Sequence, residues 1–145
     1  MEPPPPRVAT LVLVNEQGVV LGALPPIEPA TPWWTDMAPL LRAVLTRDGL
    51  KVVVLRLLEA ASINGRGGAV TYLAQVDSAA PLPALRPWAG ALAEHPLRQP
   101  WARLNGPHAD VAWARSVIEA SGGALTAEPE QIRTWNLSSL WRLPT

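Results

Sequence analysis

The feature that most constrains this chain is an apolar strand–loop–helix–strand unit in residues 7–58. Residues 8–14 are β-branched and apolar on both faces, as in a buried central strand, and residues 19–24 return as a hairpin partner. A proline-rich loop, residues 25–32, leads to apolar residues at helical spacing in residues 36–48, and residues 51–58 form another apolar strand. This alternation predicts an α/β protein.

The helix expected over residues 36–48 has a start and an end that the sequence marks. Thr35 is expected to be the N-cap, with Asp36 in the first turn, where a carboxylate complements the helix dipole. Gly49 is expected to adopt the left-handed conformation after the last turn, with Leu50 folding back on the helix. The apolar stripe consists of Met37, Leu40, Leu41, Val44 and Leu45.

This unit resembles a Nudix box, the metal-binding motif of a family of nucleotide hydrolases. The positions that match the box are Arg42, Val44, Gly49 and Leu50. The family's four glutamate positions are occupied here by Trp34, Ala43, Thr46 and Arg47. The position of its first glycine is occupied by Glu28. The resemblance implies a Nudix-like α/β/α sandwich around a mixed β-sheet.

The replaced glutamates bear on catalysis, because in the Nudix family they hold Mg²⁺ or Mn²⁺ against a pyrophosphate. Hard cations need several converging oxygen ligands. The helix offers only Asp36 and Asp48, which lie about 18 Å apart by the helical rise. Arg47 would repel a cation at a ligand position. We therefore expect no metal site, no catalytic residue and no cofactor.

Downstream residues supply another strand over residues 69–76 and a short helix around residues 88–93. The Gly-rich run 64–68 is expected to be a hairpin loop, because no helix and no Lys-Ser/Thr pair follows it. A second helix is expected over residues 108–120, with Pro107 in its first turn. Its stripe, expected to pack against the sheet, is Val111, Ala114, Val117 and Ile118.

Residues 131–144 resemble the first strand of an aminoglycoside-phosphotransferase-like kinase lobe. The resemblance rests on the stretch Trp135-Asn136-Leu137-Ser138 followed by Trp141-Arg142. It implies a downstream kinase domain as a partner and divides the chain into a disordered Pro-rich lead (1–6), a Nudix-like domain (7–126) and the start of that lobe (127–145). The alternative is that residues 127–145 contain the final strand of the sandwich.

Composition limits the partners and the location. The chain has 145 residues, a formal net charge of zero and no cysteine. We expect no nucleic-acid or membrane partner, because a neutral chain provides no general field for either and no apolar run approaches the roughly 20 residues that span a bilayer. The first residues lack a signal-peptide pattern, so a cytoplasmic location is expected.

The candidate ligand-binding residues begin with Trp33 and Trp34, whose rings could stack on a base or sugar at the helix entrance. The alternative is that they fasten the proline-rich loop to the helix as a hydrophobic staple. The remaining candidates are Asp36, Arg42, Arg47 and Tyr72. Arg42 is also explained as a surface arginine. The expected ligand is a small molecule with a ring or a phosphate group.

Three functions follow from these features. The preferred one is a catalytically degenerate Nudix-like domain that binds a ligand or serves as the N-terminal accessory domain of a small-molecule phosphotransferase. The second is a divergent hydrolase of nucleotide-like or phosphorylated metabolites, with metal ligands outside the box such as Glu59 or Asp77. The third is a structural homodimerisation module that uses exposed tryptophans.

Overall fold

The computed structural model describes residues 2–145 and has a mixed α/β fold. Its main sheet contains four strands in the order β2-β1-β4-β3. The central strands β1 and β4 are parallel, whereas both outer pairs are antiparallel, so the sheet is mixed. The strands, all confirmed as predicted to within two residues at either end, are β1 (Arg7–Val14), β2 (Val20–Ala23), β3 (Val53–Ala60) and β4 (Gly68–Gln75). Met1, the first residue of the predicted lead, lies outside the described residues.

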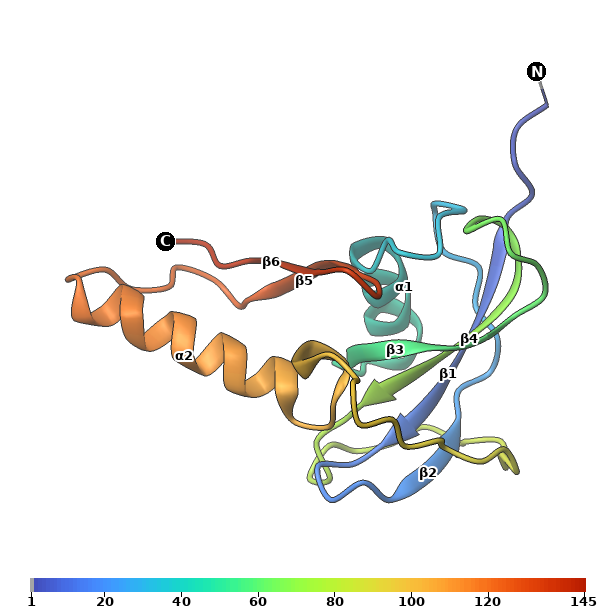
Figure 1. The fold of residues 1–145 in the computed structure, drawn as a ribbon, viewed down its shortest axis with the longest axis horizontal. Coiled ribbons are helices and arrows are strands. Elements are labelled where there is room, and N and C mark those ends of the chain that lie inside the picture. Colours follow the sequence, from blue (N-terminus) through green and yellow to red (C-terminus); the bar gives the residue numbers. More distant parts are fainter. Residues whose placement is uncertain (1) are drawn as a thin grey trace.

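Helix α1 (Ala38–Asp48) covers one face of this sheet (Figure 1). Met37, Leu40 and Val44 are fully buried against the apolar residues of β1, β3 and β4 on that face. Gly49 ends the helix in the left-handed conformation, with φ of 64°, and its N–H donates to the carbonyl of Leu45. The predicted helix and its C-terminal glycine are therefore confirmed, whereas its predicted stripe is buried only in part, because Leu41 is half-buried and Leu45 is 46% exposed.

The predicted start of α1 is wrong. Thr35 is not the N-cap and Asp36 is not in the first turn, because residues 35–37 pair with strand β5 (Glu130–Thr134). Thr134 donates its N–H to the carbonyl of Thr35, and Met37 donates to that of Ile132. This pairing satisfies backbone groups that a side-chain cap would otherwise have to satisfy, so the helix begins later.

The opposite face of the sheet is covered by chain without regular secondary structure. Trp88, Leu92 and Leu104 pack against a second apolar cluster that includes Val12 and Leu55. The short helix predicted around residues 88–93 is absent. The backbone just before it is held extended, since Arg86 exchanges two hydrogen bonds with Ala23.

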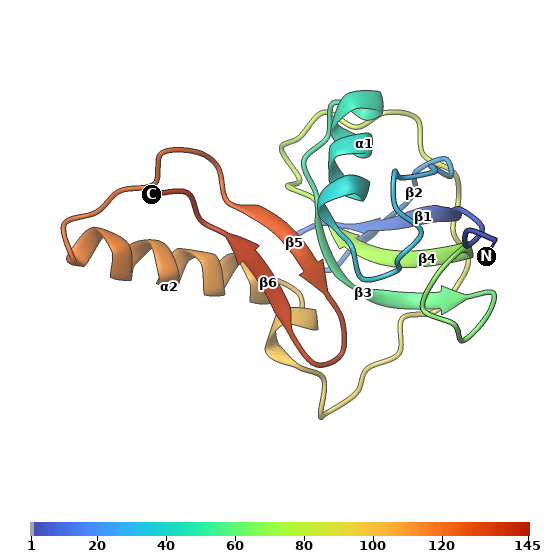
Figure 2. The ribbon, with the colours of Figure 1, turned by 90° about the horizontal axis from the view of Figure 1, so that it is seen from above.

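Helix α2 (Gly106–Ala120) and the hairpin of β5 and β6 (Ser139–Arg142) project from one side of the sheet (Figures 1 and 2). We call these two elements the limb, and the main sheet with α1 the body. The prediction that the second helix packs against the sheet is wrong: α2 contacts the short 3₁₀ helix η1 (Pro100–Ala102), and only Pro107 is buried. Of its predicted stripe, Val117 is exposed.

Gln131 fastens the hairpin to the body. Its side-chain amide donates to the carbonyl of Val54 at 2.8 Å and accepts from the N–H of Val54 at 2.9 Å. Gln131 thereby satisfies both backbone groups of a residue in the edge strand β3, as a neighbouring strand would. The hairpin nevertheless forms a two-stranded sheet of its own rather than a fifth strand of the main sheet.

Candidate functional site

Three of the candidate residues converge on a buried arginine that the sequence did not single out. Arg7, at the start of β1, has no exposed surface. Its guanidinium donates to the Tyr72 hydroxyl at 3.0 Å and to the carbonyls of Trp34 at 3.4 Å and Asp36 at 2.6 Å. Its Nε donates to the carbonyl of Thr31 at 2.9 Å. Arg7 thus organises the loop that enters α1.

Tyr72 belongs to this network. Its hydroxyl donates to the Trp34 carbonyl at 2.6 Å while it accepts from Arg7. Burial raises the pKa of the Tyr72 phenol above its usual value, although the Arg7 cation acts in the opposite direction. With both hydrogen-bonding roles of the hydroxyl used internally, Tyr72 holds the loop in place.

The paired tryptophans behave differently from each other. The indole N–H of Trp34 donates to the carbonyl of Gly67 at 2.9 Å, and its ring packs on the core below α1. Trp34 therefore joins the proline-rich loop to the β3–β4 hairpin loop, which is the hairpin loop predicted from residues 64–68. Trp33 remains 45% exposed.

The remaining charged candidates form ordinary surface contacts. Arg47 donates to the carbonyls of Pro25 and Pro26, both at 2.9 Å, and pairs with Asp48 at 2.8 Å. Arg42 pairs with Glu130 at 2.6 Å and thereby links α1 to β5. The Asp36 carboxylate accepts from the Thr31 hydroxyl at 3.0 Å. The six candidate residues do not line one common cavity.

A groove of about 1180 Å³ separates the body from the limb. Leu41 and Leu45 of α1 line one side, Val111 and Ala112 of α2 line another, and Trp141 of the hairpin lines a third. Leu41 and Leu45 belong to the predicted stripe of α1, and Leu45 is 46% exposed. The groove is therefore bordered by apolar side chains that the body leaves uncovered.

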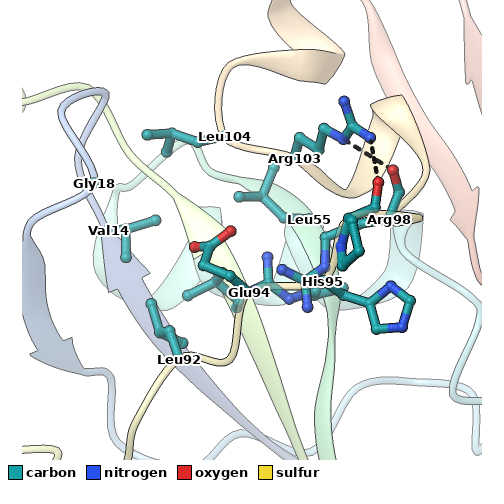
Figure 3. A pocket seen from close by; sticks show the side chains of 12 residues that line it. Val14, Gly18, Leu55, Leu92, Glu94, His95, Arg98, Arg103 and Leu104 are labelled. Atoms are coloured by element: carbon teal, nitrogen blue, oxygen red, sulfur yellow. Dashed lines mark hydrogen bonds between the residues drawn. The ribbon is translucent and has the colours of Figure 1, made fainter.

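A second cavity, of about 490 Å³, lies on the face of the sheet opposite α1 (Figure 3). We call it the arginine cleft. Its floor is apolar and comes from three strands, through Val14, Leu55 and Leu73. Its rim carries four basic side chains and one acidic side chain: Arg56, Arg98, Arg103, His95 and Glu94.

The arginines of the cleft are held by backbone carbonyls. Arg56 donates to Ala102 at 3.2 Å, Arg98 donates to Ala93 at 2.9 Å, and Arg103 donates to the carbonyl of Arg98 at 2.8 Å. Within residues 2–145, none of the three forms an ion pair with a carboxylate. Burial lowers the pKa of Arg56, and the nearby Arg98 cation lowers it further, with Glu94 opposing both.

The sequence did not reveal this cleft. Its rim comes from the Pro-interrupted segment 92–104, which has no periodicity from which a face can be assigned. The one signal available in the sequence was that Arg98 and Arg103 lie close together in a segment that also contains His95.

Residues 2–145 contain no group of three or more His, Cys, Asp or Glu side chains arranged to hold a metal ion. No helix in the same range is long and apolar enough to cross a membrane.

Comparison with known proteins gives no relative: no protein-family model, no curated protein sequence and no solved structure matches this chain significantly.

Proposed function

We propose that this chain is a non-catalytic accessory domain that packs its limb against an adjoining small-molecule phosphotransferase lobe of the aminoglycoside type. The observation that carries the proposal is that the limb leaves large apolar side chains exposed on its helix and its hairpin and borders an apolar groove. Isolated helices and two-stranded hairpins gain most of their stability from tertiary packing. We therefore expect a partner to cover the exposed apolar side chains of the limb.

Helix α2 presents apolar side chains on two faces. Val111, Ala114 and Ile118 are half-buried, and Val111 lines the groove. A second stripe with a spacing of four residues is formed by Ala109, Trp113 and Val117, and it faces solvent: Trp113 is 69% exposed. A helix that is apolar on two faces is usually covered on both.

The hairpin points to the chemistry of the partner. β6 pairs only with β5 among the described residues, so its outer edge is free to accept another strand. Leu137 in the turn and Leu140 in β6 are 67% and 54% exposed. These residues belong to the stretch that resembles the first strand of a kinase lobe, in which further strands would extend the sheet and cover them.

The groove lies where such a lobe would begin. Trp141 and Pro144 line it, so a polypeptide that continues beyond Thr145 would leave the domain beside its apolar walls. The lobe would then contact α1, α2 and the hairpin together. A second copy of this chain is the competing occupant, and the experiment below separates the two.

The non-catalytic part of the proposal rests on α1. We infer a Nudix-like sandwich scaffold from the match at Arg42, Val44 and Gly49, with the segment before α2 covering the second face. Ala43 and Thr46 carry no carboxylate, and Arg47 is tied to the proline-rich loop. We therefore expect no phosphate release from nucleoside diphosphate-linked compounds with Mg²⁺ or Mn²⁺. Turnover that a chelator abolishes would favour the divergent hydrolase.

The test compares residues 1–145 with the product of the complete reading frame that encodes them. Amide hydrogen exchange is measured on both proteins over residues 106–120 and 130–142. We expect these amides to be protected at least about tenfold more in the complete product, with β1 and β4 unchanged as the internal control.

Two results would overturn the proposal. The first is a reading frame that encodes no kinase-like lobe after the hairpin. The second is a concentration-dependent dimer of residues 1–145, seen by sedimentation, that Trp113→Glu dissociates and Glu119→Lys, at an exposed position of α2 outside the groove, does not. The dimer result would assign the limb to a second copy of the chain.

A further inference from the structure

We propose that the arginine cleft binds a small phosphorylated molecule, with the phosphate held by Arg56, Arg98 and Arg103 and the organic part resting on the apolar floor. The site is separate from the limb and from the groove, so it stands whether or not the limb has a partner.

The charge of the cleft is the first step of the argument. The whole chain has a formal net charge of zero, yet this one cavity gathers three arginines against a single carboxylate, that of Glu94. In the part of the chain that the structure describes, four arginines outside the cleft have a carboxylate within 4.0 Å (Arg42, Arg47, Arg133 and Arg142), and the others that lack one are not gathered in one cavity. An excess of like charges without counter-ions is unfavourable, and a bound anion would relieve it.

The available donors are the second step. Arg103 spends two hydrogen bonds on backbone carbonyls, whereas Arg56 and Arg98 each spend one. A guanidinium has further N–H groups in a planar fork, so all three side chains retain donors for an anion. The bonds already made restrain the side chains, which lowers the entropic cost of binding.

The anchoring of Arg56 is the third step. It projects from β3, which pairs with β4 in the main sheet, and it is half-buried. His95 adds a further polar group, since its Nδ1 accepts the N–H of Leu97 at 3.1 Å and its Nε2 is not engaged by that contact. Figure 3 shows His95, Arg98 and Arg103 around the cavity, with Glu94 on the same rim.

The size and lining of the cleft select the ligand class. A volume of about 490 Å³ lies within the range of small-molecule sites. Several guanidinium groups at one site match a phosphate, which carries close to two negative charges and three acceptor oxygens, better than a single carboxylate. The apolar floor of Val14, Leu55 and Leu73 would contact a ring or an aliphatic chain.

Calorimetric titration with pyrophosphate and with adenosine monophosphate tests the proposal, with succinate as the dicarboxylate comparison. We expect both phosphate probes to bind more tightly than succinate, and the affinity to fall with added salt. Arg98→Gln should weaken pyrophosphate binding by about tenfold or more, the scale of a lost hydrogen bond to a charged group. Arg66→Gln, which removes an exposed arginine outside the cleft, should leave binding unchanged.

Glu94→Gln distinguishes phosphate binding from a purely structural role of the rim, because loss of a structural contact would not tighten binding. Removing the one carboxylate of the rim should tighten pyrophosphate binding, by roughly threefold for an exposed charge. Circular dichroism of each variant verifies folding. The assignment is overturned if no phosphate probe binds at millimolar concentration, if succinate binds as tightly, or if Arg98→Gln and Arg66→Gln have the same effect.

Discussion

The body of this molecule buries most of its large apolar side chains, whereas the limb leaves several of its own exposed. In the body, Leu11, Leu13 and Leu40 are buried on the face of the sheet that α1 covers. In the limb, Trp113 and Leu140 are more than half exposed. The difference teaches that secondary structure alone does not complete a fold: the limb has its helix and its hairpin, but it lacks the surface on which they would pack.

The largest expected effect comes from making the same substitution on both sides of this divide. Leu40→Ala should lower the free energy of unfolding by about 3 kcal/mol, because it creates a cavity in the core. Leu140→Ala should change it by less than about 0.5 kcal/mol, because Leu140 is exposed. Urea unfolding followed by tryptophan fluorescence measures both. Equal losses would show that the limb is as well packed as the body.

The next effect concerns the buried arginine of the body. Arg7→Met should cost about 2 kcal/mol, because the carbonyls of Thr31 and Asp36 lose their donor inside the protein. Arg133→Met is the matched control, since the guanidinium of Arg133 is exposed and reaches the same loop from the surface. It makes a hydrogen bond to the Thr35 hydroxyl at 3.0 Å and a contact to the Asp36 carboxylate at 3.7 Å. A loss for Arg133→Met as large as that for Arg7→Met would contradict this account of the network.

A smaller and more local effect is expected at the junction of the two regions. Gln131→Ala leaves both backbone groups of Val54 without partners and should cost about 1 kcal/mol. The change should appear as faster amide exchange in residues 130–142, with α1 affected mainly in its first turn. Uniformly faster exchange throughout the body would mean that the hairpin is integral to the core rather than attached to it.

The smallest effect is a shift in a titration. Tyr72 is the one tyrosine of the chain, so tyrosinate absorbance reports its ionisation alone. Burial raises the pKa of Tyr72 in the folded chain. The stability that the neutral phenol contributes is therefore fully present below the unfolded pKa of about 10, and it is lost as the pH rises through the folded pKa. The folded chain should titrate at higher pH than the chain in urea. Coincident curves would contradict the buried position of Tyr72.

The sequence predicted the body better than the limb, for a physical reason. Alternation and helical spacing are local properties, so β1, β4 and α1 could be located from them. The spacing in α2 located a helix but could not name its partner, and the start of α1 depended on pairing with Thr134, far along the chain. Arg7 was missed although it shares the inward face of β1 with Ala9 and Leu11, two and four residues on.

The candidate ligand-binding residues show the same limit. Trp34, Asp36 and Tyr72 were singled out by residue type, and the structure uses them to hold a loop around Arg7. The arginine cleft is assembled from β3 and a segment more than thirty residues downstream. Neither segment has a sequence pattern that predicts contact with the other, so the cleft is visible only in the folded chain.

Amide hydrogen exchange across the isolated chain tests the contrast between body and limb most directly. Amides of β1 and β4 should exchange only through global unfolding, whereas those of α2 and β6 should exchange through local opening, at least about a hundredfold faster. That result would mean that the body is stable by itself and that the limb needs a partner for comparable stability. Protection of α2 equal to that of β4 would contradict the account.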